Sequence, residues 1–108
     1  MKYQDNLKKY DLAVNLLEDI QRKGKTMPYT SSNGYMFSLL NKDGQLGIRL
    51  SKEDRELFFT SYPDTPFMSH GAKMREYVLL PESLLDKPKS IAALIQKGYN
   101  YVNTLKPK

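Results

Sequence analysis

Residues 34–51, GYMFSLLNKDGQLGIRLS, contain two runs of strand-forming residues separated by the tetrapeptide NKDG at 41–44. The Asp-Gly pair of this tetrapeptide can adopt the left-handed backbone conformation of a tight turn at little steric cost. The second run alternates, so that one strand face carries Leu46, Ile48 and Leu50, and the other carries Gln45, Gly47 and Arg49. The stretch therefore predicts the central β-hairpin of an antiparallel sheet.

The rest of the chain divides into helical and strand-like segments around this hairpin. A broad apolar stripe predicts a first helix that stops at Gly24, Ser51 can cap a short helix, and Asp86 can cap the last one. The predicted elements are a helix at 3–23, strands at 26–31, 34–40 and 45–51, a helix at 52–61, strands at 65–69 and 74–80, and a closing helix. We expect an α+β fold of two layers, an antiparallel sheet of about five strands with helices on one face, in the order α-β-β-β-α-β-β-α.

Length and composition limit what the chain can be. With 108 residues there is room for a single domain, 1–108, with one hydrophobic core. The absence of cysteine excludes disulfides, thiolate metal sites and cysteine nucleophiles. The N-terminus lacks the apolar run of a signal peptide, and no apolar stretch approaches the roughly 20 residues that span a bilayer. We expect a cytoplasmic protein without membrane association.

The net charge of +5 makes nucleic acid a possible partner, because a basic surface attracts phosphate without base-specific contacts. The 17 basic residues are spread along the chain, with dense groups at 22–25, 87–89 and 106–108. Clustering of the first two groups on one face would favour a nucleic-acid partner, whereas dispersed charge is typical of an ordinary solvated surface.

Catalytic and metal-binding candidates are few. His70 is the single histidine, and Ser61, Asp64 and Ser69 lie near it in sequence. A base beside a nucleophile is conceivable there, but a histidine in a polar turn is usually only a turn residue. One histidine and no cysteine leave mainly carboxylates for a metal. We expect a protein that is not an enzyme, with no catalytic residues, no bound metal and no cofactor.

Aromatic residues give a more specific expectation. Because side chains alternate along a strand, Met36 and Phe37 must point to opposite faces, so both faces of the sheet carry apolar groups. If helices cover one face, the other exposes more apolar surface than a solvated sheet usually does. That face predicts a surface for an unknown protein partner or for a homodimer, unless loops or the chain's own termini cover it. The candidate partner-binding residues are Tyr29, Tyr35, Phe37, Phe67 and Tyr77.

Several of these segments together resemble a known family. GYMF at 34–37, DGQLGIRL at 43–50, the Pro-Phe pair at 66–67 and MREYVLLPESLLD at 74–86 are similar to the N-terminal domain of the TfoX/Sxy family and, more distantly, to YjbR-like proteins. The resemblance covers nearly the whole chain. It implies a two-layer fold like that of secretion chaperones and a bacterial regulatory or protein-interaction module, since the family is associated with competence regulation. It implies no catalytic residues.

Overall fold

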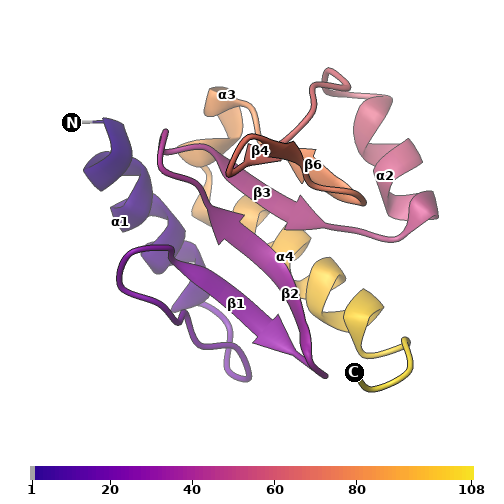
Figure 1. The fold of residues 1–108 in the computed structure, drawn as a ribbon. Coiled ribbons are helices and arrows are strands. Elements are labelled where there is room, and N and C mark those ends of the chain that lie inside the picture. Colours follow the sequence, from indigo (N-terminus) through magenta and orange to yellow (C-terminus); the bar gives the residue numbers. More distant parts are fainter. Residues whose placement is uncertain (1) are drawn as a thin grey trace.

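The computed structural model describes residues 2–108 as a sheet layer backed by helices (Figure 1). The elements are α1 (Lys2–Val14), β1 (Tyr29–Ser32), β2 (Tyr35–Leu40), β3 (Leu46–Arg49), α2 (Lys52–Phe59), β4 (Met68–Ser69), β5 (Ala72–Lys73), β6 (Tyr77–Leu79), α3 (Glu82–Leu85) and α4 (Pro88–Val102). Figure 1 shows α1 and α4 behind the sheet, which confirms the predicted α+β class with antiparallel strands.

The main sheet has four strands in the order β1-β2-β3-β6, all antiparallel, and β4 and β5 form a separate two-stranded hairpin. The prediction of about five strands in one sheet is therefore wrong for 65–69. This segment does not follow an edge of the sheet, because Phe67 is buried against the sheet face over Gly47. The chain turns at His70 and Gly71, whose φ angles are positive at 52° and 76°, and β5 already occupies 72–73, between the expected strands at 65–69 and 74–80.

The first helix is shorter than its apolar stripe predicts. α1 ends at Val14, and Ile20 is buried in the core although it lies outside any helix. The chain after Val14 turns back along α1, and the Arg22 side chain donates a hydrogen bond to the Asp11 carboxylate at 2.7 Å. Lys23 then pairs with Tyr29 at the outer side of β1. Gly24, with φ of 83°, serves the turn into β1 and does not end a helix.

The two predicted helix caps have different outcomes. Ser51 caps α2 as expected, since its side chain accepts a hydrogen bond from the Asp54 backbone N–H at 3.2 Å. Asp86 does not cap α4, which is preceded by Lys87 and begins with Pro88. Proline suits that first position because its φ is fixed and its missing N–H would have no partner there. Asp86 instead forms an ion pair with Lys9 of α1 at 2.8 Å.

The core lies between the sheet and the helices. Leu46, Ile48 and Leu50 are buried there, as the alternation predicts. Phe37 has no partner in the β1–β2 pairing, which forms a β-bulge at this point. Because of the bulge, two neighbouring side chains both face the helices: the Phe37 ring contacts Tyr99 of α4, and the Ser38 hydroxyl is hydrogen-bonded to Tyr10 of α1. The helices thus cover one face of the sheet.

Candidate functional site

The sheet face opposite the helices is covered at its centre. Gly47 and its cross-strand partner Leu39 share this face, and Leu39 is only 2% exposed. The Phe67 ring lies over Gly47 and stacks on Tyr77 of β6, with centroids 5.7 Å apart. A loop of the chain therefore covers part of the predicted binding face, which is the alternative that the sequence left open.

The five candidate partner-binding residues do not form one surface. Phe37 lies in the core on the helix side, and Phe67 is buried on the opposite side, each with 0% exposure. Tyr29, Tyr35 and Tyr77 are half-buried, and Tyr29 stands in the edge strand beside Lys23. The structure brings Tyr35 and Tyr77 together as walls of one groove.

This groove lies at the end of the sheet where β2 begins, β3 ends and β6 begins. Its volume is about 670 Å³. We call it the Tyr35–Tyr77 groove and define it by Tyr35, Met36, Arg49, Arg75, Tyr77 and Lys108, with Gly34, Met74 and Glu76 completing its lining. Met36 is 37% exposed, which is high for a large apolar side chain on a strand. The groove therefore combines apolar, aromatic and cationic side chains on three adjacent strands.

A tight polar network around Glu76 forms one wall of the groove. The Glu76 carboxylate accepts two hydrogen bonds from Arg49, at 2.9 and 2.5 Å, and one from the Tyr101 hydroxyl of α4 at 2.5 Å. Arg55 of α2 adds an ion pair at 3.6 Å. Glu76 has a positive φ of 69°, and its backbone carbonyl accepts from the Leu50 N–H. Contacts from three elements hold this unusual backbone conformation in place.

The network also fixes the position of Arg49. Its guanidinium carbon lies 5.3 Å from the Tyr35 ring centre and 5.8 Å from that of Tyr101. Cation–π contacts of this kind add to the two hydrogen bonds with Glu76. Arg49 is therefore held in one orientation, and sequence alternation alone, which predicts only that it faces away from the core, does not reveal these partners.

Burial and the contacts of the groove also set the protonation states of Glu76, Tyr101 and Tyr77. Burial alone would raise the pKa of Glu76, but hydrogen bonds from Tyr101 and Arg49, together with the charges of Arg49 and Arg55, outweigh it and lower this pKa. The pKa of Tyr101 is raised, chiefly by its hydrogen bond to Glu76. Burial raises the pKa of Tyr77 to about 12. At neutral pH the groove thus holds an ionised Glu76 and a protonated Tyr77.

The C-terminal tail forms the other wall of the groove. The Tyr35 hydroxyl donates to the Lys106 carbonyl at 2.7 Å, and the Asn33 side-chain amide donates to the Leu105 carbonyl at 2.9 Å. The Lys108 backbone N–H reaches the Asn33 carbonyl at 3.3 Å, and its ammonium lies 5.6 Å from the Tyr35 ring centre. These contacts keep a cation at the β2 end of the groove.

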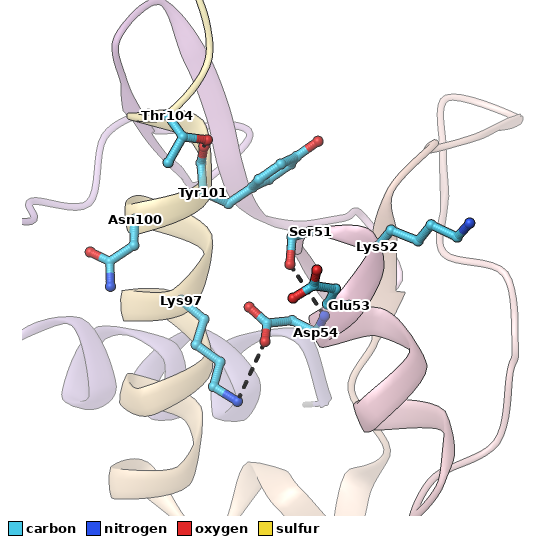
Figure 2. Close-up of a pocket in the computed structure, with 8 residues that line it drawn as sticks. All are labelled: Ser51, Lys52, Glu53, Asp54, Lys97, Asn100, Tyr101 and Thr104. Carbon is cyan, nitrogen blue, oxygen red and sulfur yellow. Dashed lines mark hydrogen bonds and ion pairs between the residues drawn. The ribbon is translucent and has the colours of Figure 1, made fainter.

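A second hollow of about 570 Å³ lies between α2 and the end of α4 (Figure 2). Figure 2 shows two contacts among its polar groups: the Ser51 hydroxyl accepts from the Asp54 backbone N–H, and the Asp54 carboxylate pairs with Lys97 at 3.9 Å. The Thr104 hydroxyl donates to the Tyr101 carbonyl at 2.6 Å. These contacts stabilise the start of α2 and the end of α4.

The structure does not assemble the catalytic candidates. His70 is exposed in a small hollow beside the β2–β3 turn, whereas Ser61 lines a different groove between α2 and α4. Ser69 lines the same hollow as its sequence neighbour His70 but is buried at 7% exposure, so only these two of the candidates share a hollow with each other in the structure described for residues 2–108. Within residues 2–108, no group of three or more metal-binding side chains comes together. Of the helices in this described range, none combines the length and apolar character needed to cross a membrane.

Arg75, Glu76, Tyr101 and Lys108 are groove or network residues that sequence reasoning did not select. They are far apart in sequence, with Arg49 and Glu76 separated by 27 positions and Glu76 and Tyr101 by 25. No local pattern marks such pairs. No protein-family model and no curated protein matches this sequence. Function is therefore inferred from the groove and its charges.

Proposed function

We propose that this protein is a non-enzymatic interaction module, similar to a TfoX N-terminal domain, that binds a protein partner in the Tyr35–Tyr77 groove in the bacterial cytoplasm. The observation that carries the proposal is the composition of the groove: half-buried Tyr35 and Tyr77 and the exposed Met36 surround a fixed arginine. Tyrosine, methionine and arginine are enriched at protein interfaces, where they supply large contact areas around a few directed polar groups.

Rigidity of the groove supports binding. Arg49 is held by Glu76 and two tyrosine rings, so little side-chain freedom would be lost when a partner covers it. Met36 is unbranched and can adapt its shape to the surface that it meets. A rigid centre with an adaptable apolar flank is the arrangement of many interaction sites.

Nucleic acid is the second candidate, favoured by the net charge of +5 and by cations beside tyrosine rings. The two dense basic groups at 22–25 and 87–89 follow different edges of the sheet, however. Lys23 pairs with the outer side of β1, whereas Lys87 follows β6, the opposite edge strand, by way of α3. The groove is lined mostly by tyrosine, methionine and arginine, a composition typical of protein interfaces. A protein partner therefore accounts better for the groove.

Site-specific photocrosslinking in cells that naturally contain this protein tests the proposal. A benzophenone amino acid replaces Met36 in the groove or, as the control, Leu12, which is 55% exposed on α1 in the helix layer. We expect the Met36 position to capture one discrete protein and the Leu12 position to capture none. Equal adducts from both positions, or none from Met36, would overturn the proposal.

The mass of the crosslinked adduct and its sensitivity to nuclease identify the class of partner. An adduct of twice the 12.5 kDa chain mass would identify a second copy of this protein as the occupant. An adduct removed by nuclease would identify nucleic acid and contradict a protein partner. Anisotropy measured with labelled DNA provides the parallel test: contacts through dispersed cations should weaken by orders of magnitude between roughly 50 and 200 mM salt.

A further inference from the structure

Cationic side chains outnumber carboxylates in the Tyr35–Tyr77 groove. Arg49, Arg75 and Lys108 line it, against the single carboxylate of Glu76. That carboxylate is already bound by Arg49 and lies 3.6 Å from Arg55. Arg75 is exposed and forms no ion pair within the described part of the chain, and the ammonium of Lys108 meets only the face of Tyr35. Two cations of the groove thus have no carboxylate partner.

Tyr77 adds a free hydrogen-bond donor. Its ring lines the groove, and in residues 2–108 its hydroxyl has no hydrogen-bond partner, although no buried polar atom of this range is left unsatisfied. The hydroxyl is therefore partly buried but not fully enclosed, and it can donate to a ligand in the groove. Because burial raises the pKa of Tyr77 to about 12, the group stays protonated at neutral pH. Tyr35 differs, since its hydroxyl already donates to the tail.

The two free cations stand at opposite ends of the groove. Lys108 lies against Gly34 and Tyr35 at the start of β2, whereas Arg75 lies two residues before β6. β2 and β6 flank β3, and adjacent strands are about 4.8 Å apart, so the starts of β2 and β6, beside which the two cations lie, are roughly 10 Å apart. An extended chain rises about 3.3 Å per residue, so two side chains separated by one residue lie about 6.6 Å apart on the same face, and the long side chains of Arg75 and Lys108 can span the rest of the distance.

We infer that the groove binds an extended segment of a partner protein in which two acidic side chains, aspartate or glutamate, are separated by one residue. The carboxylates pair with Arg75 and Lys108, and the Tyr77 hydroxyl donates to one of them. Neighbouring apolar residues of the segment pack on Met36 and Met74. This inference rests on the proposed function and adds the chemistry of the partner.

Fluorescence anisotropy with synthetic peptides tests the inference on the full chain. The probe is a labelled heptapeptide of alternating leucine and glutamate, and the matched control has glutamine in place of each glutamate. We expect the acidic peptide to bind about tenfold more tightly, since charged hydrogen bonds contribute about twice as much as neutral ones. Equal affinities of the two peptides, or no binding of either at 1 mM peptide (about −4.1 kcal/mol or weaker), would overturn the inference.

Charge-reversal variants separate local recognition from general attraction. Arg75→Glu should weaken binding of the acidic peptide about tenfold, whereas Lys8→Glu, an equal charge change at an exposed position of α1, should leave it nearly unchanged. Equal losses in both variants would show that only net charge matters. An oligothymidylate of equal charge that binds more tightly than the peptide would also contradict the inference.

The two proposals fail in different ways. Capture of a protein at Met36 without an acidic preference in the peptide assay would leave the proposed function standing and overturn the acidic partner. Absence of any adduct at Met36 would overturn the proposed function, whatever the peptides show.

Discussion

Gly47 in the middle of β3 is a position at which a single methyl group should destabilise the fold. A Cβ atom added there would lie 2.5 Å from Cε2 and 2.6 Å from Cγ of Phe67. Carbon atoms prefer a separation of about 3.5–4.0 Å, so Gly47→Ala must displace the ring. Phe67 has 0% exposure and is packed from both sides, which leaves it little space to move.

The expected size of the effect combines two opposing contributions. Overpacking a well-packed site costs about 1–3 kcal/mol. Replacing glycine by alanine within a strand recovers about 0.5–1 kcal/mol of backbone entropy. We therefore expect Gly47→Ala to lower the free energy of unfolding by up to about 2.5 kcal/mol, with about 1 kcal/mol near the middle of the range. Urea denaturation followed by circular dichroism measures this change from the transition midpoint.

A double-mutant cycle shows whether the Phe67 ring is the cause. In a Phe67→Leu background the planar ring is absent, and Gly47→Ala should then be neutral or stabilising by up to about 1 kcal/mol. The same loss of stability in both backgrounds would refute the packing of Phe67 on Gly47. It would also remove the explanation for why the centre of this sheet face is covered.

Three further predictions concern the polar network, the core and the hairpin turn. Glu76→Gln should lower the free energy of unfolding at pH 7 by about 1–3 kcal/mol, because Arg49 and Arg55 lose their carboxylate. In the folded protein the pKa of Glu76 lies below its usual value of 4.5. The stability that the ionised carboxylate adds is therefore complete above the pKa of the unfolded chain, and it is lost as the pH falls through the lower pKa of the folded protein. The urea midpoints of the wild-type protein and of Glu76→Gln, measured from pH 7 to 2.5, should therefore converge in acid. A difference between the two midpoints that stays constant with pH would exclude Glu76 as the titrating group. Ile48→Asp should leave the chain unfolded by circular dichroism at neutral pH, since it buries an unpaired charge at 0% exposure, and a native spectrum would contradict the β3 register. His70→Gly should change stability by less than about 0.5 kcal/mol, because His70 is exposed at a positive φ of 52°, and a loss of partner capture by the folded variant would indicate a functional histidine.

The sequence predicts those features of the fold that depend on neighbouring residues. The alternation in 45–51 places Ile48 in the core, and the cap at Ser51 starts α2 where expected. Features that depend on distant contacts were not predictable from such patterns. The end of α1 is decided by the return of the chain past Asp11 to pair with Tyr29, which outweighs a continuous apolar stripe.

The candidate site shows the same division. Alternation predicts that Tyr77 faces away from Val78 and the core, and the structure places Tyr77 in the groove. The burial of Phe67 on the same face depends on a glycine 20 positions earlier in the chain, which no periodicity links to it. Alternation predicts only that Arg49 faces away from the core, whereas in the structure it is hydrogen-bonded to Glu76, 27 positions later in the chain.

The tie between the chain's tail and the β1–β2 turn has a practical consequence for any fusion made at Lys108. Whatever is attached there leaves the protein beside Gly34 and Tyr35, at the edge of the groove. A short flexible tether keeps its cargo near the groove at an effective concentration in the millimolar range. An acidic epitope tag joined to this end would compete with added ligand from within the same molecule and mimic a weak partner interaction. Labels belong instead at the start of α1, which Figure 1 shows on the far side of the molecule from the tail.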